Sequence, residues 1–248
     1  MVITTTGVVF SISSLGLILC GFWFFKAFQK IGGLRSGSRV GILLSVFFLS
    51  LAFEHALLAF GGLFFATMPD ALYAILVVNH FILAVAAALG TYLAFYILFP
   101  KISSWPATFM ILAFGFFGTA LTIFTHPQPF IDANNSIDWN MQRPAELSIY
   151  FLLMLSLVAP ILIFMRNLFQ SVSRDVKIVS FIIVLTHSLG MINVSILFSG
   201  LFYEEGNLRT DIFDKVLGVI GILFIVGFLV IPFVTGWVSK ITNNKNAQ

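Results

Sequence analysis

Seven long apolar stretches constrain this chain more than any other feature of its sequence. They cover, to within a few residues, 8–29, 40–66, 71–99, 106–125, 146–168, 177–202 and 213–238. Each holds roughly 20 residues or more, which at about 1.5 Å per residue matches a hydrocarbon core of about 30 Å. Because backbone polar groups in lipid must be satisfied within the segment, we predict helices. The expected fold is all-α, a single domain (1–248) of seven transmembrane helices.

The small number of charges agrees with this fold and excludes several others. Only 9% of the residues are charged and 59% are hydrophobic, whereas a soluble domain carries about 25% charged residues. A water-soluble domain and a disordered chain are both excluded by these values. The net charge of +3 gives no reason to expect nucleic acid as a partner. The partner that the composition indicates is the lipid bilayer.

The positions of the basic residues predict the orientation in the membrane. If the N-terminus lies outside, ten of the 13 basic residues are cytoplasmic: Lys26, Lys30, Arg35, Arg39, Lys101, Arg166, Arg174, Lys177, Lys240 and Lys245. Because Lys and Arg accumulate on the cytoplasmic side of short loops, the opposite orientation is disfavoured. We therefore expect a multi-pass protein of the cell membrane, with its N-terminus outside and its C-terminus in the cytoplasm.

A few polar side chains lie within the apolar stretches, and they are the candidate ligand-binding residues. The six are Glu54, His55, Asn79, His80, His187 and Asn193. Ionisable groups in the membrane are costly, so each is a functional hypothesis. At the helical rise per residue, His55 and His80 lie roughly 13–15 Å below the outer face. A tight turn at Pro69 joins their helices, so we expect that the two imidazoles can meet.

Three interpretations of these groups remain open from the sequence. His55 and His80 could ligate a haem iron or a transition metal. Glu54 and His55 are adjacent and point about 100° apart on a helix, so we do not expect both to face the same ion. The groups could instead form a pocket that senses a ligand or protons. They could also be structural, with hydrogen bonds to Asn79, Ser188 or backbone carbonyls that fix helix packing.

Motifs of the common seven-helix and enzyme families are absent from the sequence. The seventh stretch has no central lysine for a retinal Schiff base, since Lys215 lies at its outer end. Phe95-Tyr96-Ile97 stands where a receptor would carry Asp-Arg-Tyr. No Gly-x-Ser-x-Gly, His-x-x-x-His or P-loop motif occurs, so we do not expect an enzyme.

The order of features resembles the seven-helix N-terminal membrane sensor region of prokaryotic histidine kinases. The similar segments are Leu93 to Pro100, Ile111 to Thr125, the segment around Trp139, Met165 to Phe169, and Ser171 to Lys177. The resemblance implies signal transduction in a receptor-like bundle. It departs from the family in one respect, because no kinase domain follows before Gln248. We therefore expect a signal to pass to a separate partner.

The leading hypothesis is a non-enzymatic sensor-like or accessory subunit that binds a small apolar ligand or a membrane partner. The first alternative is a haem- or metal-binding redox subunit that uses His55 and His80. The second alternative is a small transporter, although no internal sequence repeat supports it. A partner membrane protein and a homo-oligomer both remain open.

Overall fold

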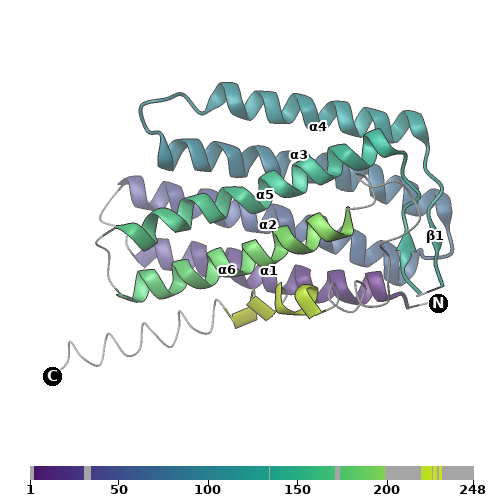
Figure 1. Cartoon of the computed structure of the whole chain (residues 1–248), viewed down its shortest axis with the longest axis horizontal. Helices are drawn as coiled ribbons and strands as arrows, with labels where there is room; N and C mark the ends of the chain where they lie inside the picture. Colours follow the sequence, from purple (N-terminus) through teal and green to yellow (C-terminus); the bar gives the residue numbers. More distant parts are fainter. Residues whose placement is uncertain are drawn as a thin grey trace.

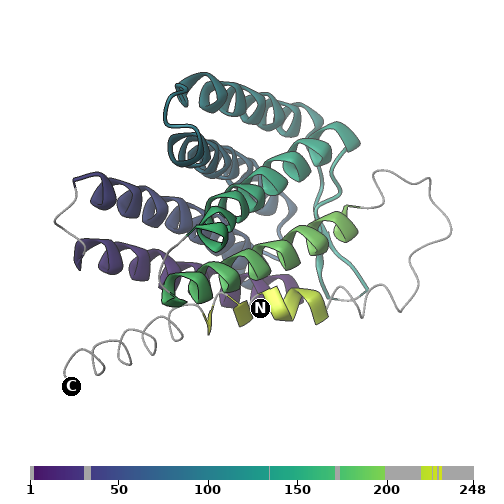
Figure 2. The same cartoon turned by 60° about the vertical axis from the view of Figure 1, so that its left-hand side comes forward.

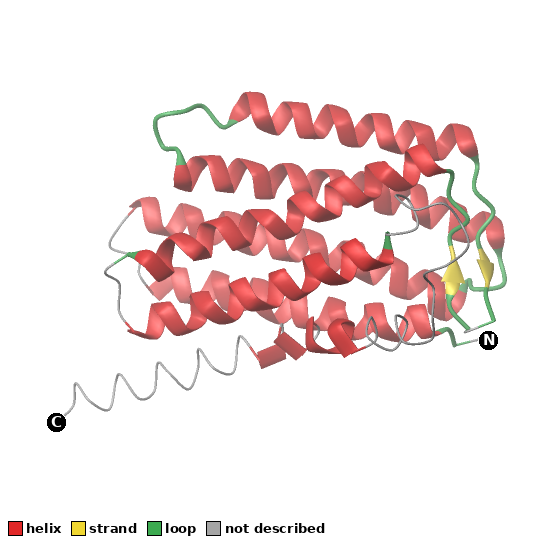
Figure 3. Ribbon diagram, in the orientation of Figure 1, coloured by secondary structure: helices red, strands yellow, loops and turns green. Residues whose placement is uncertain are grey.

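The structure is a computed structural model that describes residues 3–30, 35–133, 135–170, 174–198, 219–224, 226–227 and 229–230. Six long helices make up most of it (Figures 1 and 3): α1 (Thr5–Lys30), α2 (Arg35–Phe64), α3 (Pro69–Leu98), α4 (Trp105–Thr125), α5 (Arg143–Phe169) and α6 (Arg174–Leu197). All six are long and apolar enough to cross a membrane. The chain is a predominantly helical, multi-pass membrane protein, as the sequence predicts.

The first six predicted spans match α1 to α6, with differences at their ends. Prolines fix the starts of α3, α4 and α5 at one of their first two positions. Proline is tolerated there because the first backbone N–H groups of a helix have no partner within it. The predicted seventh span falls on residues 219–224, 226–227 and 229–230, which are helical. The rest of that span lies outside the described residues, as do Arg209, Lys215, Lys240 and Lys245.

Helix α3 lies at the centre of the arrangement. It packs against α2, α4 and α5, while α1 pairs with α2 and α6 pairs with α5. Figures 1 and 2 show α4 at one edge of the bundle, beside α3. The buried core includes Phe24, Phe47, Phe48 and Leu152. The side chains within it come mainly from α1, α2, α3 and α5.

Small residues bring the helices into close contact. Gly90 of α3 lies where α2 and α5 meet. A Cβ atom on it would lie 3.0 Å from the ring of Phe47 and 3.2 Å from the methyl of Ala159. Gly90 therefore lies at a helix–helix contact, and Ala86 on the same helix is fully buried. Such close approach is how helices associate in lipid.

The helical residues after 218 pack against α6 in the opposite direction. A Cβ atom on Gly190 would meet the ring of Phe224, and one on Gly227 would meet Thr186. Residue numbers rise along α6 while they fall along its neighbour, so the two segments are antiparallel. This is the direction that a seventh membrane crossing requires.

A short hairpin between α4 and α5 covers one end of the bundle and holds the N-terminus. Strands β1 (Phe130–Ile131) and β2 (Ile137–Asp138) pair antiparallel. The backbone N–H of Thr5 donates to the Asn135 carbonyl at 2.8 Å, and the Asn135 amide donates to the Ile3 carbonyl at 2.8 Å. These bonds tie the start of α1 to the longest polar connection in the chain.

Candidate functional site

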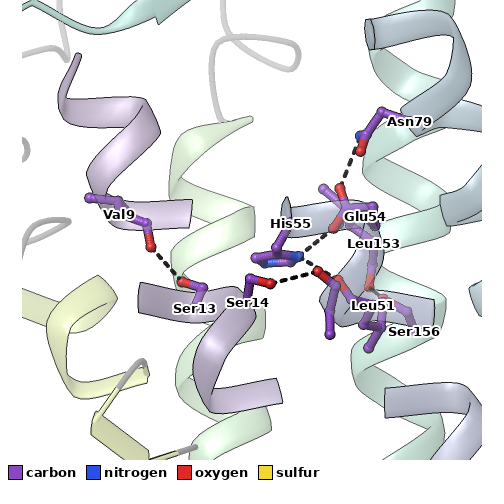
Figure 4. A network of polar contacts seen from close by, with 10 residues as sticks. Val9, Ser13, Ser14, Leu51, Glu54, His55, Asn79, Leu153 and Ser156 are labelled. Atoms are coloured by element: carbon purple, nitrogen blue, oxygen red, sulfur yellow. Dashed lines mark hydrogen bonds and ion pairs between the residues drawn. The ribbon is translucent and has the colours of Figure 1, made fainter. Parts of the chain in front are cut away.

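A buried carboxylate joins α2 to α3 in the interior of the bundle. Glu54 of α2 is only 2% exposed, and Asn79 of α3 only 3%. The Asn79 side-chain amide donates a hydrogen bond to Glu54 Oε1 at 3.0 Å (Figure 4). Glu54 lies ten residues before the end of α2 and Asn79 ten residues after the start of α3. Because these ends meet in a tight turn, the two groups lie at equal depth.

His55 supplies the charge partner of this carboxylate. Its Nδ1 contacts Glu54 Oε2 as an ion pair and lies 3.0 Å from the Leu51 carbonyl (Figure 4). A carbonyl oxygen can only accept, so Nδ1 donates to Leu51, and Glu54 Oε2 has no hydrogen bond among the described residues. Although adjacent side chains leave a helix about 100° apart, Glu54 and His55 are in contact. The ring folds back along its own helix, and its edge packs on Phe10 of α1 at a centroid distance of 5.1 Å.

A second acceptor in this cluster also has no hydrogen bond among the described residues. Asn79 Oδ1 is buried and has no hydrogen-bond partner among the residues that the structure describes. A buried amide oxygen without a partner costs about 1–3 kcal/mol. The group can accept a hydrogen bond from a bound molecule. It can also accept one from a protonated Glu54 if the amide turns over. The cluster of Glu54, His55 and Asn79 can therefore bind a donor or a proton.

His80 forms a separate junction between α3, α4 and α5. It is fully buried, with Nδ1 2.9 Å from Thr122 Oγ1 and Nε2 3.1 Å from Ser148 Oγ. The Thr122 hydroxyl donates its proton to the Gly118 carbonyl at 3.1 Å, so its oxygen accepts from Nδ1–H. Nε2 then accepts from the Ser148 hydroxyl. This assignment satisfies a neutral ring at both nitrogens.

The structure does not bring His55 and His80 together. His55 packs against α1, whereas His80 faces α4 and α5, and no interaction joins the two rings within the described residues. A haem iron on His80 would have to displace Thr122 or Ser148 from a ring nitrogen. In the part of the chain that is described, no group of three or more His, Cys, Asp or Glu side chains could hold a metal. The predicted metal pair is not supported by this geometry.

The two remaining predicted residues belong to α6 and its neighbours. His187 is fully buried, and its Nδ1 donates to the Ile183 carbonyl at 2.8 Å. Its ring lies edge-on to Phe48 of α2, at a centroid distance of 5.9 Å. Asn193 faces Gly221 across the antiparallel contact. The six predicted residues therefore divide among separate places, and only Glu54, His55 and Asn79 form one cluster.

Two hydroxyl residues of the His80 junction, Thr122 and Ser148, were not among the predicted site residues. Hydroxyls are common in membrane helices because they donate to their own helix backbone. The sequence could have indicated Thr122 through its spacing from Gly118. Residues four apart lie on one face of a helix, so α4 places a small residue beside a hydroxyl.

The interhelical hydrogen bonds of His80 make a testable contribution to the free energy of unfolding. Replacing His80 with Leu is expected to destabilise the protein by about 1–3 kcal/mol, since it removes two interhelical hydrogen bonds. A double-mutant cycle of His80→Leu with Thr122→Val, read by unfolding in detergent, should give a coupling of about 0.5–1.5 kcal/mol. Thr119→Val is the matched control, because the Thr119 hydroxyl donates only to its own helix at Gly115. Zero coupling, or an Nδ1 that is unprotonated by nitrogen NMR, would contradict the assignment.

Comparison with known proteins assigns no family to this chain. The chemistry of the cluster therefore follows from its contacts alone. No protein-family model, curated protein or solved structure matches this chain.

Proposed function

We propose that this chain is a non-enzymatic membrane protein, a sensor-like or accessory subunit, that responds to occupancy of the cluster of Glu54, His55 and Asn79. The observation that carries the proposal is the buried Asn79 Oδ1, which lacks a hydrogen-bond partner among the described residues and lies beside a buried carboxylate. Polar groups left in this state within a membrane are typical of functional sites. The occupant is a proton, or a small and mostly apolar molecule with a hydrogen-bond donor.

The proposal includes a seven-span topology in the cell membrane, with the N-terminus outside. Two observations support it. The antiparallel contact with α6 gives the residues after 218 the direction of a seventh span. Six described cations also lie at one end of the alternating helices, against Arg143 at the other: Lys26, Arg39, Lys101, Arg166, Arg174 and Lys177. This asymmetry supports a cytoplasmic location for that end.

The contacts of the cluster suggest how a signal leaves it. Glu54 is bonded to α3 through Asn79, and its ion-pair partner His55 packs on α1 through Phe10. Protonation of Glu54, or a ligand at Asn79, changes the charge and the hydrogen bonds between these three helices. A shift of one helix against another carries the change to the cytoplasmic end. The receiver is a partner membrane protein or a second copy of the chain.

The test replaces Glu54 with Gln, which keeps the side-chain size and the acceptor for Asn79 but cannot ionise. Spin labels at Phe22→Cys in α1 and Phe99→Cys after α3 report the spacing of the two helices that flank α2. Both positions are exposed, and the native Cys20 is buried and can stay. In nanodiscs, the wild-type protein should gain a protonated-carboxyl infrared band and change its label distances on acidification.

The Glu54→Gln protein should lack the part of this band that comes from Glu54, as a difference spectrum against the wild-type protein shows, and its label distances should not change. Glu146→Gln is the matched control, since Glu146 is a half-buried acid at the start of α5, away from the cluster. That variant should respond like the wild-type protein. Label distances that move equally in the wild-type and Glu54→Gln proteins would refute the proposal, as would a carboxyl band of equal intensity in the two proteins.

The geometry favours no second function. The redox alternative needs His55 and His80 on one group, and each ring lies against different helices. The visible absorption spectrum of the purified protein checks this directly, because a Soret band would reinstate a haem role.

A further inference from the structure

The lipid-facing side of α2 and α3 carries an open apolar groove of roughly 400 Å³. Its walls include Val46 and Phe53 of α2 and Phe81 and Val85 of α3. The one hydroxyl in the lining, on Ser50, donates to the Val46 carbonyl of its own helix at 2.8 Å. The groove therefore offers an incoming molecule almost only apolar contacts, and it suits a hydrocarbon chain.

The groove leads toward a cation at the cytoplasmic end of the same two helices. Arg39 lies seven residues before Val46, and Tyr92 lies seven residues after Val85. A spacing of seven puts residues on one face of a helix. The exposed Arg39 reaches across to α3, where its guanidinium lies 5.8 Å from the centroid of the Tyr96 ring. The two helices thus carry a positive charge beyond the end of the groove, about 10 Å along α2 from Val46.

Arg39 is placed at the depth of lipid headgroups. Tyr92 packs against Trp105 at a centroid distance of 5.3 Å, and Tyr and Trp collect at the membrane–water boundary. Among the described residues, no Asp or Glu forms an ion pair with Arg39. An arginine at this boundary, free of a carboxylate, is complementary to a phosphate group.

The groove lies within reach of an acyl chain anchored at Arg39. At the helical rise, Val46 lies about 10 Å and Phe53 about 21 Å along α2 from Arg39. The hydrocarbon of one leaflet is about 15 Å deep, half of the bilayer core. The groove thus lies beside the inner end of such a chain and continues past the depth of one leaflet. We propose that the α2–α3 groove binds one anionic phospholipid of the cytoplasmic leaflet, with its phosphate on Arg39.

Native mass spectrometry of the detergent-purified full chain tests this with phosphatidylglycerol and phosphatidylcholine of equal chain length as probes. The wild-type protein should retain phosphatidylglycerol roughly fivefold more strongly, the effect of one basic residue at a membrane surface. Arg39→Gln should abolish the preference, while Arg39→Lys should keep part of it. Lys101→Gln removes an exposed cation at the same end of the bundle and should leave the preference intact.

A second variant tests the groove. Val46→Trp fills it and should weaken binding of both lipids, without changing the preference for the anionic one. The proposal is overturned if Arg39→Gln keeps the preference, or if Lys101→Gln loses as much of it. It is also overturned if Val46→Trp binds both lipids as the wild-type protein does. Glu54→Gln should bind lipid normally, so failure here is distinguishable from failure of the proposed sensing role.

Discussion

Replacing Gly115 with Ala is expected to destabilise the protein by about 1–3 kcal/mol, the usual cost of overpacking. A Cβ atom on Gly115 would overlap the methyl of Ala84 on α3 and lie 3.2 Å from the Ala84 Cα. Neither atom can be moved by a side-chain rotation, so α3 and α4 must separate. Close packing is the main force that joins helices in lipid, so separation has a large effect. Unfolding in detergent, followed by circular dichroism, measures the change.

A second substitution should restore the stability that Gly115→Ala removes. Ala84→Gly removes the methyl that the new side chain strikes, so the double variant should recover most of the lost stability. Gly221→Ala is the matched control, because the nearest atom to its added Cβ is 3.7 Å away, an ordinary contact. That control should stay within about 0.5 kcal/mol of the wild-type protein. If Gly115→Ala is as mild as the control, the α3–α4 contact is looser than described.

The sequence predicted the helices well because the membrane sets a simple condition. A chain in lipid must satisfy its own backbone, and length and apolarity then identify each helix. Packing partners do not follow from that condition. Gly90 could be recognised from its spacing to Ala86. The contact of Gly115 with Ala84 depends on how α4 is rotated about its axis, and a uniformly apolar helix gives little indication of this.

The same limit explains the outcome at the site. Depth along a helix follows from residue number, so the sequence put His55 and His80 at similar depth, and their neighbours Glu54 and Asn79 do lie at one level. The direction in which a side chain points around the helix axis cannot be read from residue number in this way. Asn79 and His80 are adjacent and point about 100° apart, so Asn79 faces Glu54 on α2 while His80 faces Thr122 on α4. The sequence treated both as neighbours of one pocket. The contact of His55 with Glu54 was not predicted either.

Replacing both Glu54 and Asn79 with Leu is expected to leave the protein at least as stable as the wild type, and up to about 4 kcal/mol more stable. A buried ionic or polar pair often contributes less than apolar side chains of similar volume, because its groups lose their hydration. The unpartnered Asn79 Oδ1 adds to that cost. Glu54→Leu alone should instead destabilise by about 1–3 kcal/mol, since it leaves the whole Asn79 amide without a partner.

These two variants test whether the cluster is functional or serves only to hold α2 and α3 together. If Glu54 and Asn79 serve only to join α2 to α3, the double variant loses that bond and should be less stable than the wild type. If they are kept for sensing, the double variant should be stable and fail to change its α1–α3 label distance on acidification. His55 remains bonded to the Leu51 carbonyl in both variants and can stay neutral, so it does not confuse the comparison. A stable double variant that still responds to acid would place the sensing group elsewhere.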